Sequence, residues 1–262
     1  MKNILDNIYE HKLIEVRNRK KIISLTEICA KIKCCNKPHD FFLTLKNKSD
    51  KSETALICEI KRGSPSAGLI RQNFDIIEIA KSYQRAGASC LSVLTDEKFF
   101  LSNNNFLEKA RSVVDIPILR KDFIVDAYQV YEARMLGADC ILLIVAMLDD
   151  YKLQELEKIA LELGLSVLIE VHNQEELRRA LKLKSRLIGI NNRNLKTLEV
   201  NLQNSLDLVN QVPKDYVLVA ESGIKSLTDI KILKQFGINC FLIGEYFMRQ
   251  ENIENAVKSM LL

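Results

Sequence analysis

The segment Pro117–Val145, PILRKDFIVDAYQVYEARMLGADCILLIV, decides the class of fold. It opens with a short run typical of a β-strand, Pro117–Lys121, and returns to a second such run at Asp139–Val145. Between them, Ala127–Leu136 has the pattern of a helix and is followed by Gly137, a residue typical of helix C-termini. A strand, a helix and a second strand in this order predict parallel strands joined by a crossover helix.

The same unit recurs along the chain. Further strand-like runs are Ala55–Lys61, Cys90–Thr95, Ser166–Val171, Leu187–Asn191, Val217–Glu221 and Cys240–Gly244. Further helical patterns are Asp75–Ala86, Leu153–Leu163, Gln174–Leu181, Leu202–Gln211 and Thr228–Phe236. The repeat predicts an α/β fold, a closed (β/α)8 TIM barrel. An open, doubly wound sheet would be favoured by a GxGxxG turn after the first strand, which the sequence lacks.

Residues 1–50 lie outside this repeat. We expect them to form an N-terminal helical extension to a barrel that spans residues 51–262, with both parts in a single domain. Asn3–Lys20 has apolar residues at helical spacing, Leu25–Lys33 predicts a second short helix, and Lys46–Glu53 is predicted to be a polar linker. The extension could plug the closed end of the barrel or cover its open end as a lid, and the pattern leaves both open.

Bulk composition excludes several classes of protein. With 262 residues, 47% hydrophobic, and a net charge of +4, the chain is typical of a globular protein rather than a nucleic-acid binder. The longest basic run, Arg17–Lys21, is typical of a solvated helix face. No window approaches the roughly 18 apolar residues of a membrane span, and Met1–Lys12 does not resemble a signal peptide. The seven cysteines show no metal-binding or paired spacing, which indicates reduced thiols in a cytoplasmic protein.

Polar side chains stand at the carboxyl ends of several predicted strands, where barrels carry their catalytic groups. Each alone could be half of an ion pair at the rim, but together they predict a mouth lined by charges of both signs. Such a crowded group perturbs its own pKa values and suits acid–base chemistry. The residues are Glu59, Lys61, Lys121, Glu170, Asn191 and Glu221.

A phosphate site is predicted beside these groups. Barrels often bind phosphate with the loops after the last two strands, where the sequence has Glu221-Ser222-Gly223 and Ile243-Gly244-Glu245. The loop after the first strand, Arg62-Gly63-Ser64-Pro65-Ser66, adds hydroxyl groups and a cation. Each glycine alone could simply serve a tight turn, whereas the combination predicts a phosphorylated small molecule as ligand.

These segments resemble the indole-3-glycerol-phosphate synthase family in order and spacing. The likeness runs from the helix at Ile4-Leu5 to Gly244, and its motifs are Glu59–Ser66, Pro117–Ile124, Leu142–Ala146, Ile188–Arg193 and Ala220–Ile224. The resemblance implies ring closure of 1-(2-carboxyphenylamino)-1-deoxyribulose 5-phosphate with loss of carbon dioxide and water, a lyase step in tryptophan biosynthesis. It also implies that neither a metal nor an organic cofactor is needed.

The resemblance also implies roles for the residues at the mouth. Lys121 would be the general acid, and Lys61 would contact the substrate carboxylate or act as acid in dehydration. Glu170 would remove a proton, Glu59 and Glu221 would position the substrate and the lysines, and Asn191 would hydrogen-bond a hydroxyl group or a catalytic side chain. Nearby cations or desolvation would lower the pKa of a lysine, and carboxylates would oppose that shift. Substrate and phosphate would be held by Ser64, Arg193, Ser222, Gly223, Gly244 and Glu245, with Phe99 or Phe100 against the aromatic ring.

Three positions depart from the family pattern. Ser102 stands where a glycine is usual, Asn194 replaces a common aspartate, and Ala67 replaces a frequent lysine. Ser102 makes the conformation of the loop after the second strand uncertain. Asn194 puts a local ion pair in doubt, and Ala67 removes one cation from the mobile loop after the first strand. Because these changes spare the proposed acids and bases, we expect activity to survive, with weaker substrate binding.

Two other functions compete with this prediction. A phosphoribosylanthranilate isomerase would use an early cysteine as base, but strand parity turns Cys58 to the face opposite Glu59. A non-catalytic barrel would be favoured by loss of a catalytic residue, and all six are present. We expect a monomer or weak homodimer, with association with other enzymes of tryptophan synthesis left open, and no nucleic-acid or membrane partner.

Overall fold

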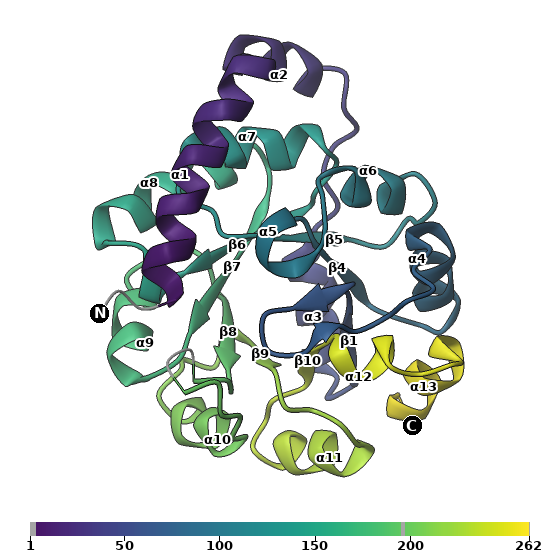
Figure 1. Ribbon diagram of the computed structural model, residues 1–262. Helices are drawn as coiled ribbons and strands as arrows, with labels where there is room; N and C mark the ends of the chain where they lie inside the picture. The colour runs from purple at the N-terminus through teal and green to yellow at the C-terminus, as the bar shows by residue number, and fades with distance from the viewer. Residues whose placement is uncertain (1–3, 195–196, 262) are drawn as a thin grey trace.

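A computed structural model of the chain describes residues 4–194 and 197–261. Within this range, eight parallel strands close into a barrel in the order β1-β10-β9-β8-β7-β6-β5-β4, with helices around it (Figure 1). The (β/α)8 barrel predicted from the sequence is therefore confirmed. The barrel strands are β1 (Ala55–Ile60), β4 (Cys90–Leu94), β5 (Ile118–Lys121), β6 (Cys140–Ile144), β7 (Ser166–Val171), β8 (Leu187–Asn191), β9 (Val217–Glu221) and β10 (Cys240–Ile243).

The helices follow the strands as the repeat requires. Those around and beyond the barrel are α4 (Ile76–Arg85), α5 (Glu97–Phe100), α6 (Asn105–Arg111), α7 (Ala127–Met135), α8 (Asp150–Glu162), α9 (Gln174–Ala180), α10 (Gln203–Val209), α11 (Leu227–Gln235), α12 (Glu245–Met248) and α13 (Ile253–Met260), with a 3-10 turn η1 (Val145–Met147). A hairpin in the loop after β1 pairs β2 (Gly63–Ser64) with β3 (Gly68–Leu69). Side-chain caps begin several of these helices, as Asp75 does for α4.

Strand parity separates an inner from an outer apolar layer. On β1, Ile57 faces the barrel interior, whereas Leu56 and Cys58 pack outward in the cluster that includes Tyr83 of α4. Burial raises the pKa of the Cys58 thiol well above its ordinary value. Cys58 therefore lies away from the mouth and unreactive, as strand parity predicts, which removes the basis of the isomerase alternative.

The closed end of the barrel is plugged by α3 (Phe41–Asp50). Phe41 and Leu45 are fully buried among the inward residues of the strands, including Ala55 and Cys240. The predicted polar linker at Lys46–Glu53 is wrong for its first part, because α3 continues to Asp50. The polar residues of that part are the solvated face of an amphipathic helix, where Lys46 and Asp50 form an ion pair.

The open end is covered by a different helix. α1 (Ile4–Ile22) passes over the carboxyl ends of the strands, and α2 (Leu25–Ile32) continues beside α7 (Figure 1). Val16 of α1, Ile28 of α2 and Tyr128 of α7 form a small apolar cluster of their own. The plug and the helix over the mouth, which the sequence offered as alternatives for one segment, are thus two separate helices.

The plug predicts a sharp contrast between two leucines of α3. Leu45→Ala should lower the free energy of unfolding by about 2–5 kcal/mol, because it opens a cavity in the barrel interior. Leu43 is 48% exposed on the same helix, so Leu43→Ala should cost well under about 1 kcal/mol. Urea unfolding followed by circular dichroism measures both, and equal effects would show that α3 does not contribute to the core.

Candidate active site

A cavity of about 720 Å³ opens at the carboxyl ends of the strands. It brings together nearly all the residues predicted to form the site, although they come from seven separate segments. Those that line it are Glu59, Lys61, Ser64, Lys121, Glu170, Asn191, Arg193, Glu221, Ser222, Gly223, Gly244 and Glu245. Leu5 and Ile8 of α1 also line it, so α1 forms part of its wall.

Lys121 lies at the centre of the charged groups. Its Nζ is 2.9 Å from Oε2 of Glu170 on β7 and 2.5 Å from Oε2 of Glu221 on β9. The Nδ2 group of Asn191 donates to Oε1 of Glu170 at 3.2 Å, so both oxygens of this carboxylate are engaged. A second pair, Lys61 Nζ to Glu59 Oε1 at 2.7 Å, lies at the end of β1.

Two glycines make room for the buried carboxylates. A Cβ atom on Gly189 would collide with the Glu221 carboxylate, and one on Gly244 would collide with that of Glu59. Both glycines therefore serve close approach, since neither has a positive φ angle. Gly244, predicted as a phosphate ligand, thus has a structural task as well.

Burial and neighbouring charges move the pKa values at the mouth in opposite directions. Burial opposes the charge of Lys121, but Glu170, Glu221 and Glu59 outweigh it and raise the lysine pKa. Burial also works against ionised Glu170, yet Lys121 and His172 keep the pKa of this carboxyl well below its ordinary value. Burial, joined by the charges of Glu170 and Glu59, raises the pKa of Glu221 to about 7 despite Lys121. The carboxylates therefore outweigh burial at Lys121, and the lysine pKa is raised and not lowered.

His172 is a residue of the site that the sequence argument missed. Its Nε2 lies 3.3 Å from Oε1 of Glu170, and its Nδ1 lies 2.9 Å from Oε2 of Glu176. The signal was present, because a histidine two positions after Glu170 on an extended strand shares its face. The search stopped at the last residue of each strand-like run and so omitted it.

The groups predicted to bind phosphate also line the cavity. Ser64 lies in the β2–β3 hairpin, and its Oγ accepts from the backbone N–H of Ala67 at 3.2 Å. Ser222 and Gly223 have positive φ angles of 65° and 83°, which turns the chain sharply after β9. The carboxylate of Glu245 pairs with Arg249 at 2.7 Å, so this acidic side chain is neutralised at the cavity edge.

The aromatic residues after β4 divide between two places. Phe100 lines the cavity and contacts Phe123, with ring centroids 6.0 Å apart. Phe99 packs edge-on against His11 of α1 at 5.7 Å and does not line the cavity. Of the two rings predicted to face the substrate, only Phe100 lines the cavity, whereas Phe99 contacts α1.

Two of the three residues that depart from the family pattern, Ser102 and Asn194, make local hydrogen bonds. Ser102 is buried, and its hydroxyl donates to the backbone oxygen of Leu94, which closes the loop after β4 where a glycine is usual. Leu101, just before it, takes the positive φ of 54° that the loop requires. The Oδ1 atom of Asn194 accepts a hydrogen bond from the backbone N–H of Thr197 at 3.2 Å. This residue therefore makes a local hydrogen bond where an aspartate was expected to make an ion pair.

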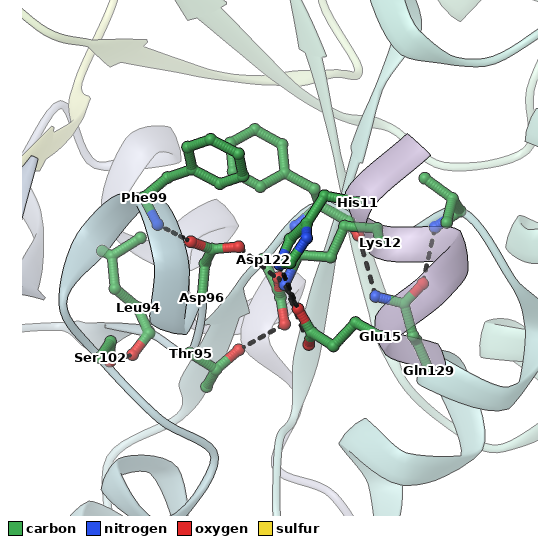
Figure 2. Close-up of polar contacts among 12 residues, drawn as sticks. His11, Lys12, Glu15, Leu94, Thr95, Asp96, Phe99, Ser102, Asp122 and Gln129 are labelled. Atoms are coloured by element: carbon green, nitrogen blue, oxygen red, sulfur yellow. Dashed lines mark hydrogen bonds and ion pairs between the residues drawn. The ribbon is translucent and has the colours of Figure 1, made fainter. Parts of the chain in front are cut away.

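A buried ion cluster attaches α1 to the mouth (Figure 2). Lys12 is fully buried, and its Nζ lies 2.8 Å from Oδ2 of Asp96 and 2.7 Å from Oδ1 of Asp122. The Oγ1 of Thr95 donates to the second oxygen of Asp122 at 2.7 Å. Asp122 directly follows Lys121, so the same short segment carries the central lysine and the attachment point of α1.

The rest of α1 is tied to α7 by side chains from the basic run. Arg19 pairs with Glu132 at 2.8 Å, and Lys20 pairs with Asp126 at 2.9 Å. Arg120, also fully buried, reaches the same Glu132 at 2.7 Å. Two residues of the basic run therefore hold the helix on the barrel, which agrees with a helix face and not with a nucleic-acid patch.

The described residues contain no candidate metal site, membrane-spanning helix or disulfide. Among residues 4–194 and 197–261, no group of three or more His, Cys, Asp or Glu side chains is placed to hold a metal ion. The helices in the described part of the chain include none that is long and apolar enough to cross a membrane. All seven cysteines are free thiols.

The ion cluster predicts that two lysines of α1 differ greatly in importance. Lys12→Met removes the cation from buried Asp96 and should lower the free energy of unfolding by about 3–5 kcal/mol. Lys20→Met breaks an exposed ion pair on the same helix and should cost less than about 1 kcal/mol. Urea unfolding of both variants measures the difference; a small effect of Lys12→Met would show that the cluster does not hold α1.

The raised pKa of Glu221 predicts a pH-dependent effect on stability. Between its ordinary pKa of 4.5 and its folded value of about 7, the folded state holds a proton that the unfolded state has lost. This contribution to stability is present at low pH and is lost as the pH rises through about 7. From pH 5.5 to pH 8, the free energy of unfolding of Glu221→Gln should therefore improve by about 2 kcal/mol relative to wild type. Urea titrations at both pH values test this, and a difference that stays constant with pH would contradict it.

Solved structures share the fold of this chain. A 3-hexulose-6-phosphate synthase superposes with a TM-score of 0.64 at 12% identity, covering 79% of this chain and 98% of that one. A thiamine phosphate pyrophosphorylase from Pyrococcus furiosus gives 0.59 at 15% identity, covering 80% and 94%. At these identities the likeness shows the barrel alone.

Sequence relatives are far more similar. The family model described as indole-3-glycerol phosphate synthase matches residues 5–260. A protein of that name from Polynucleobacter necessarius subsp. necessarius is 51% identical over 254 residues, 95% of each chain. Another from Zymomonas mobilis subsp. pomaceae is 47% identical over 261 residues, covering 100% of this chain and 99% of its own. With this likeness over nearly its whole length, the chain belongs to the indole-3-glycerol phosphate synthase family.

Proposed function

We propose that this protein converts 1-(2-carboxyphenylamino)-1-deoxyribulose 5-phosphate into indole-3-glycerol phosphate, carbon dioxide and water. The observation that carries the proposal is Lys121 held between Glu170 and Glu221 at the barrel mouth. A proton donor enclosed by two possible acceptors is what a ring closure followed by a dehydration requires. Family membership supports the reaction, and the geometry supports the role proposed for each residue.

The cavity is lined by both apolar and polar groups, which suits a substrate with a ring at one end and a phosphate at the other. Leu94, Phe100, Phe123 and Leu142 supply apolar wall near β4, β5 and β6. Ser64, Ser222, Gly223 and Gly244 lie on the side of β1, β9 and β10, with Arg193 and Arg249 nearby. The benzoate ring would pack by Phe100, and the phosphate would lie among the hydroxyl, backbone N–H and guanidinium groups.

Lys121 is assigned as the general acid of ring closure. As the aromatic carbon attacks the ketone carbon, the carbonyl oxygen takes a proton from Nζ and becomes a hydroxyl group. The bond to the carboxylate then breaks, carbon dioxide leaves, and its electron pair restores the aromatic ring. Glu170 and Glu221 raise the pKa of Lys121. The substrate carbonyl therefore has to take the place of one of these carboxylates at Nζ before proton transfer to the carbonyl is favourable.

The dehydration uses the remaining groups. Lys61, held by Glu59, donates a proton to the departing hydroxyl group, and Glu170 removes a proton from the ring being formed. Asn191 holds Glu170 from the side away from Lys121, and Glu221 positions the lysine. α1 acts as a lid, since Leu5 and Ile8 close the cavity above these groups.

We propose that the protein works in the cytoplasm as a monomer or weak homodimer. Seven free thiols suit a reducing compartment. Of the large exposed apolar residues, Ile14 lies on α1, Tyr151 on α8 and Phe236 directly after α11. Scattered residues of this kind do not require a permanent partner.

The acid assignment predicts a large loss of turnover on removal of one amine. Lys121→Met should lower kcat by about 10²- to 10⁴-fold, the usual contribution of a positioned acid. The fluorescence of the indole product measures turnover, and circular dichroism checks the fold. Lys46→Met, on the far end of the barrel, should keep wild-type activity. Full activity of Lys121→Met would remove the lysine from its role, and an inactive, folded wild type would overturn the proposed reaction.

A further inference from the structure

His172 lies directly beyond β7 with a carboxylate at each ring nitrogen. Nδ1 is 2.9 Å from Oε2 of Glu176, and Nε2 is 3.3 Å from Oε1 of Glu170. Its side chain is only 11% exposed. The ring thus connects the base at the mouth to a second carboxylate on α9, outside the cavity.

Glu176 is a fixed anchor. Its Oε2 also accepts from the backbone N–H of His172 at 2.8 Å, and its Oε1 accepts from Nδ2 of Asn173 at 2.7 Å. Asn173 in turn caps α9 by accepting from the N–H of Glu176 at 3.0 Å. These bonds fix the Glu176 carboxylate, so Nδ1 of His172 has to carry a proton to donate to it.

Protonation of the other ring nitrogen, Nε2, determines whether His172 is charged. A neutral ring protonated at Nδ1 would place the lone pair of Nε2 3.3 Å from a buried carboxylate oxygen, which is repulsive. A proton on Nε2 turns this into an attraction between opposite charges, although the contact is not aligned as a hydrogen bond. Burial opposes the charged ring, but Glu170 and Glu176 outweigh it and raise the pKa of His172 to about 10.

Resting on the proposed function, we propose that His172 is a positioning residue, a permanent imidazolium that keeps Glu170 ionised and oriented while Lys121 acts on the substrate. In the unliganded site, Lys121 contacts Oε2 of Glu170, whereas His172 and Asn191 approach Oε1. When the substrate carbonyl draws Lys121 away, Oε2 becomes free to accept a proton. Oε1 stays held by two groups that do not touch the reacting atoms.

This arrangement solves a problem of charge at the mouth. Glu170 is buried beside Glu221, so loss of the lysine contact alone would favour its protonation. His172 from the end of β7 is the second cation beside it. The base therefore stays ionised through the steps in which the lysine is engaged elsewhere.

Two substitutions separate this role from a structural one. In His172→Gln, the amide nitrogen takes the position of Nε2 and keeps a donor at Glu170. In His172→Asn, it takes the position of Nδ1 and keeps only the bond to Glu176. We expect kcat to fall by about 10- to 100-fold in His172→Asn with KM changed less than about threefold, and by clearly less in His172→Gln. The acidic limb of the kcat/KM profile should move to higher pH in both, because Glu170 loses a neighbouring cation.

The order of the two variants decides the outcome. If His172→Asn is the more active, the ring serves only to anchor the loop through Glu176, and the proposal is overturned. Wild-type kcat and pH profile in both variants would overturn it as well. If wild type itself forms no indole product, the proposed function fails instead, and the two failures are thereby distinguished.

A third variant leaves the histidine in place and covers the case in which the substituted loops fold poorly. Glu176→Gln removes one of the two charges that keep the ring protonated. Its activity should fall as the pH rises through about 7–9, where the His172 proton would now be lost, while wild type keeps its activity there. Histidine ring signals in NMR spectra report the same titration directly. A ring that stays protonated to pH 9 in this variant, or loses its proton without loss of activity, would contradict the proposal.

Discussion

The contact between Lys121 and two buried carboxylates is the constraint around which the mouth of the barrel is built. Removing a carboxylate from water costs several kcal/mol, so Glu170 and Glu221 need the lysine as much as it needs them. The barrel supplies the geometry, because the three residues lie at the carboxyl ends of β5, β7 and β9, which are alternate strands whose inward side chains meet at one level. Gly189 on the intervening strand leaves the space that the Glu221 carboxylate occupies.

The two ends of the barrel are closed by different kinds of interaction. α3 seals the amino-terminal end with apolar side chains, an attraction that is non-directional and adds to stability without concern for charge. α1 is fixed at the other end by Lys12 and its carboxylates, together with contacts from Ile8 and Val16. Ion pairs require defined geometry, so they place α1 accurately over the cavity. The ion pair with Asp122 thus attaches α1 directly beside the central lysine, Lys121.

The sequence allowed the barrel, its strand ends and most of the site to be predicted, because strand parity and helix stops are local properties. The strand containing Glu170 shows why this works: alternation fixes which side chains face inward, and the fold brings inward strand ends together. The prediction missed the plug helix α3 because polar residues dominate residues 46–53. The apolar residues that mark the helix, Phe41 and Leu45, lie just upstream. Lys12 could not be assigned either, because its partners Asp96 and Asp122 meet it only in three dimensions.

The pKa values of the charged groups at the mouth show which of the ion pairs around Lys121 is the easier to break. Lys121 held by two ionised carboxylates is a poor acid, since each of them raises its pKa. Glu221, with a pKa of about 7 and one oxygen without a hydrogen-bond partner, is the one whose hold is easily relaxed by a proton. Glu170, held ionised by further partners, keeps its charge. Protonation of Glu221 therefore weakens one restraint on Lys121 and leaves Glu170 ionised, which would favour the proton transfer proposed for the lysine.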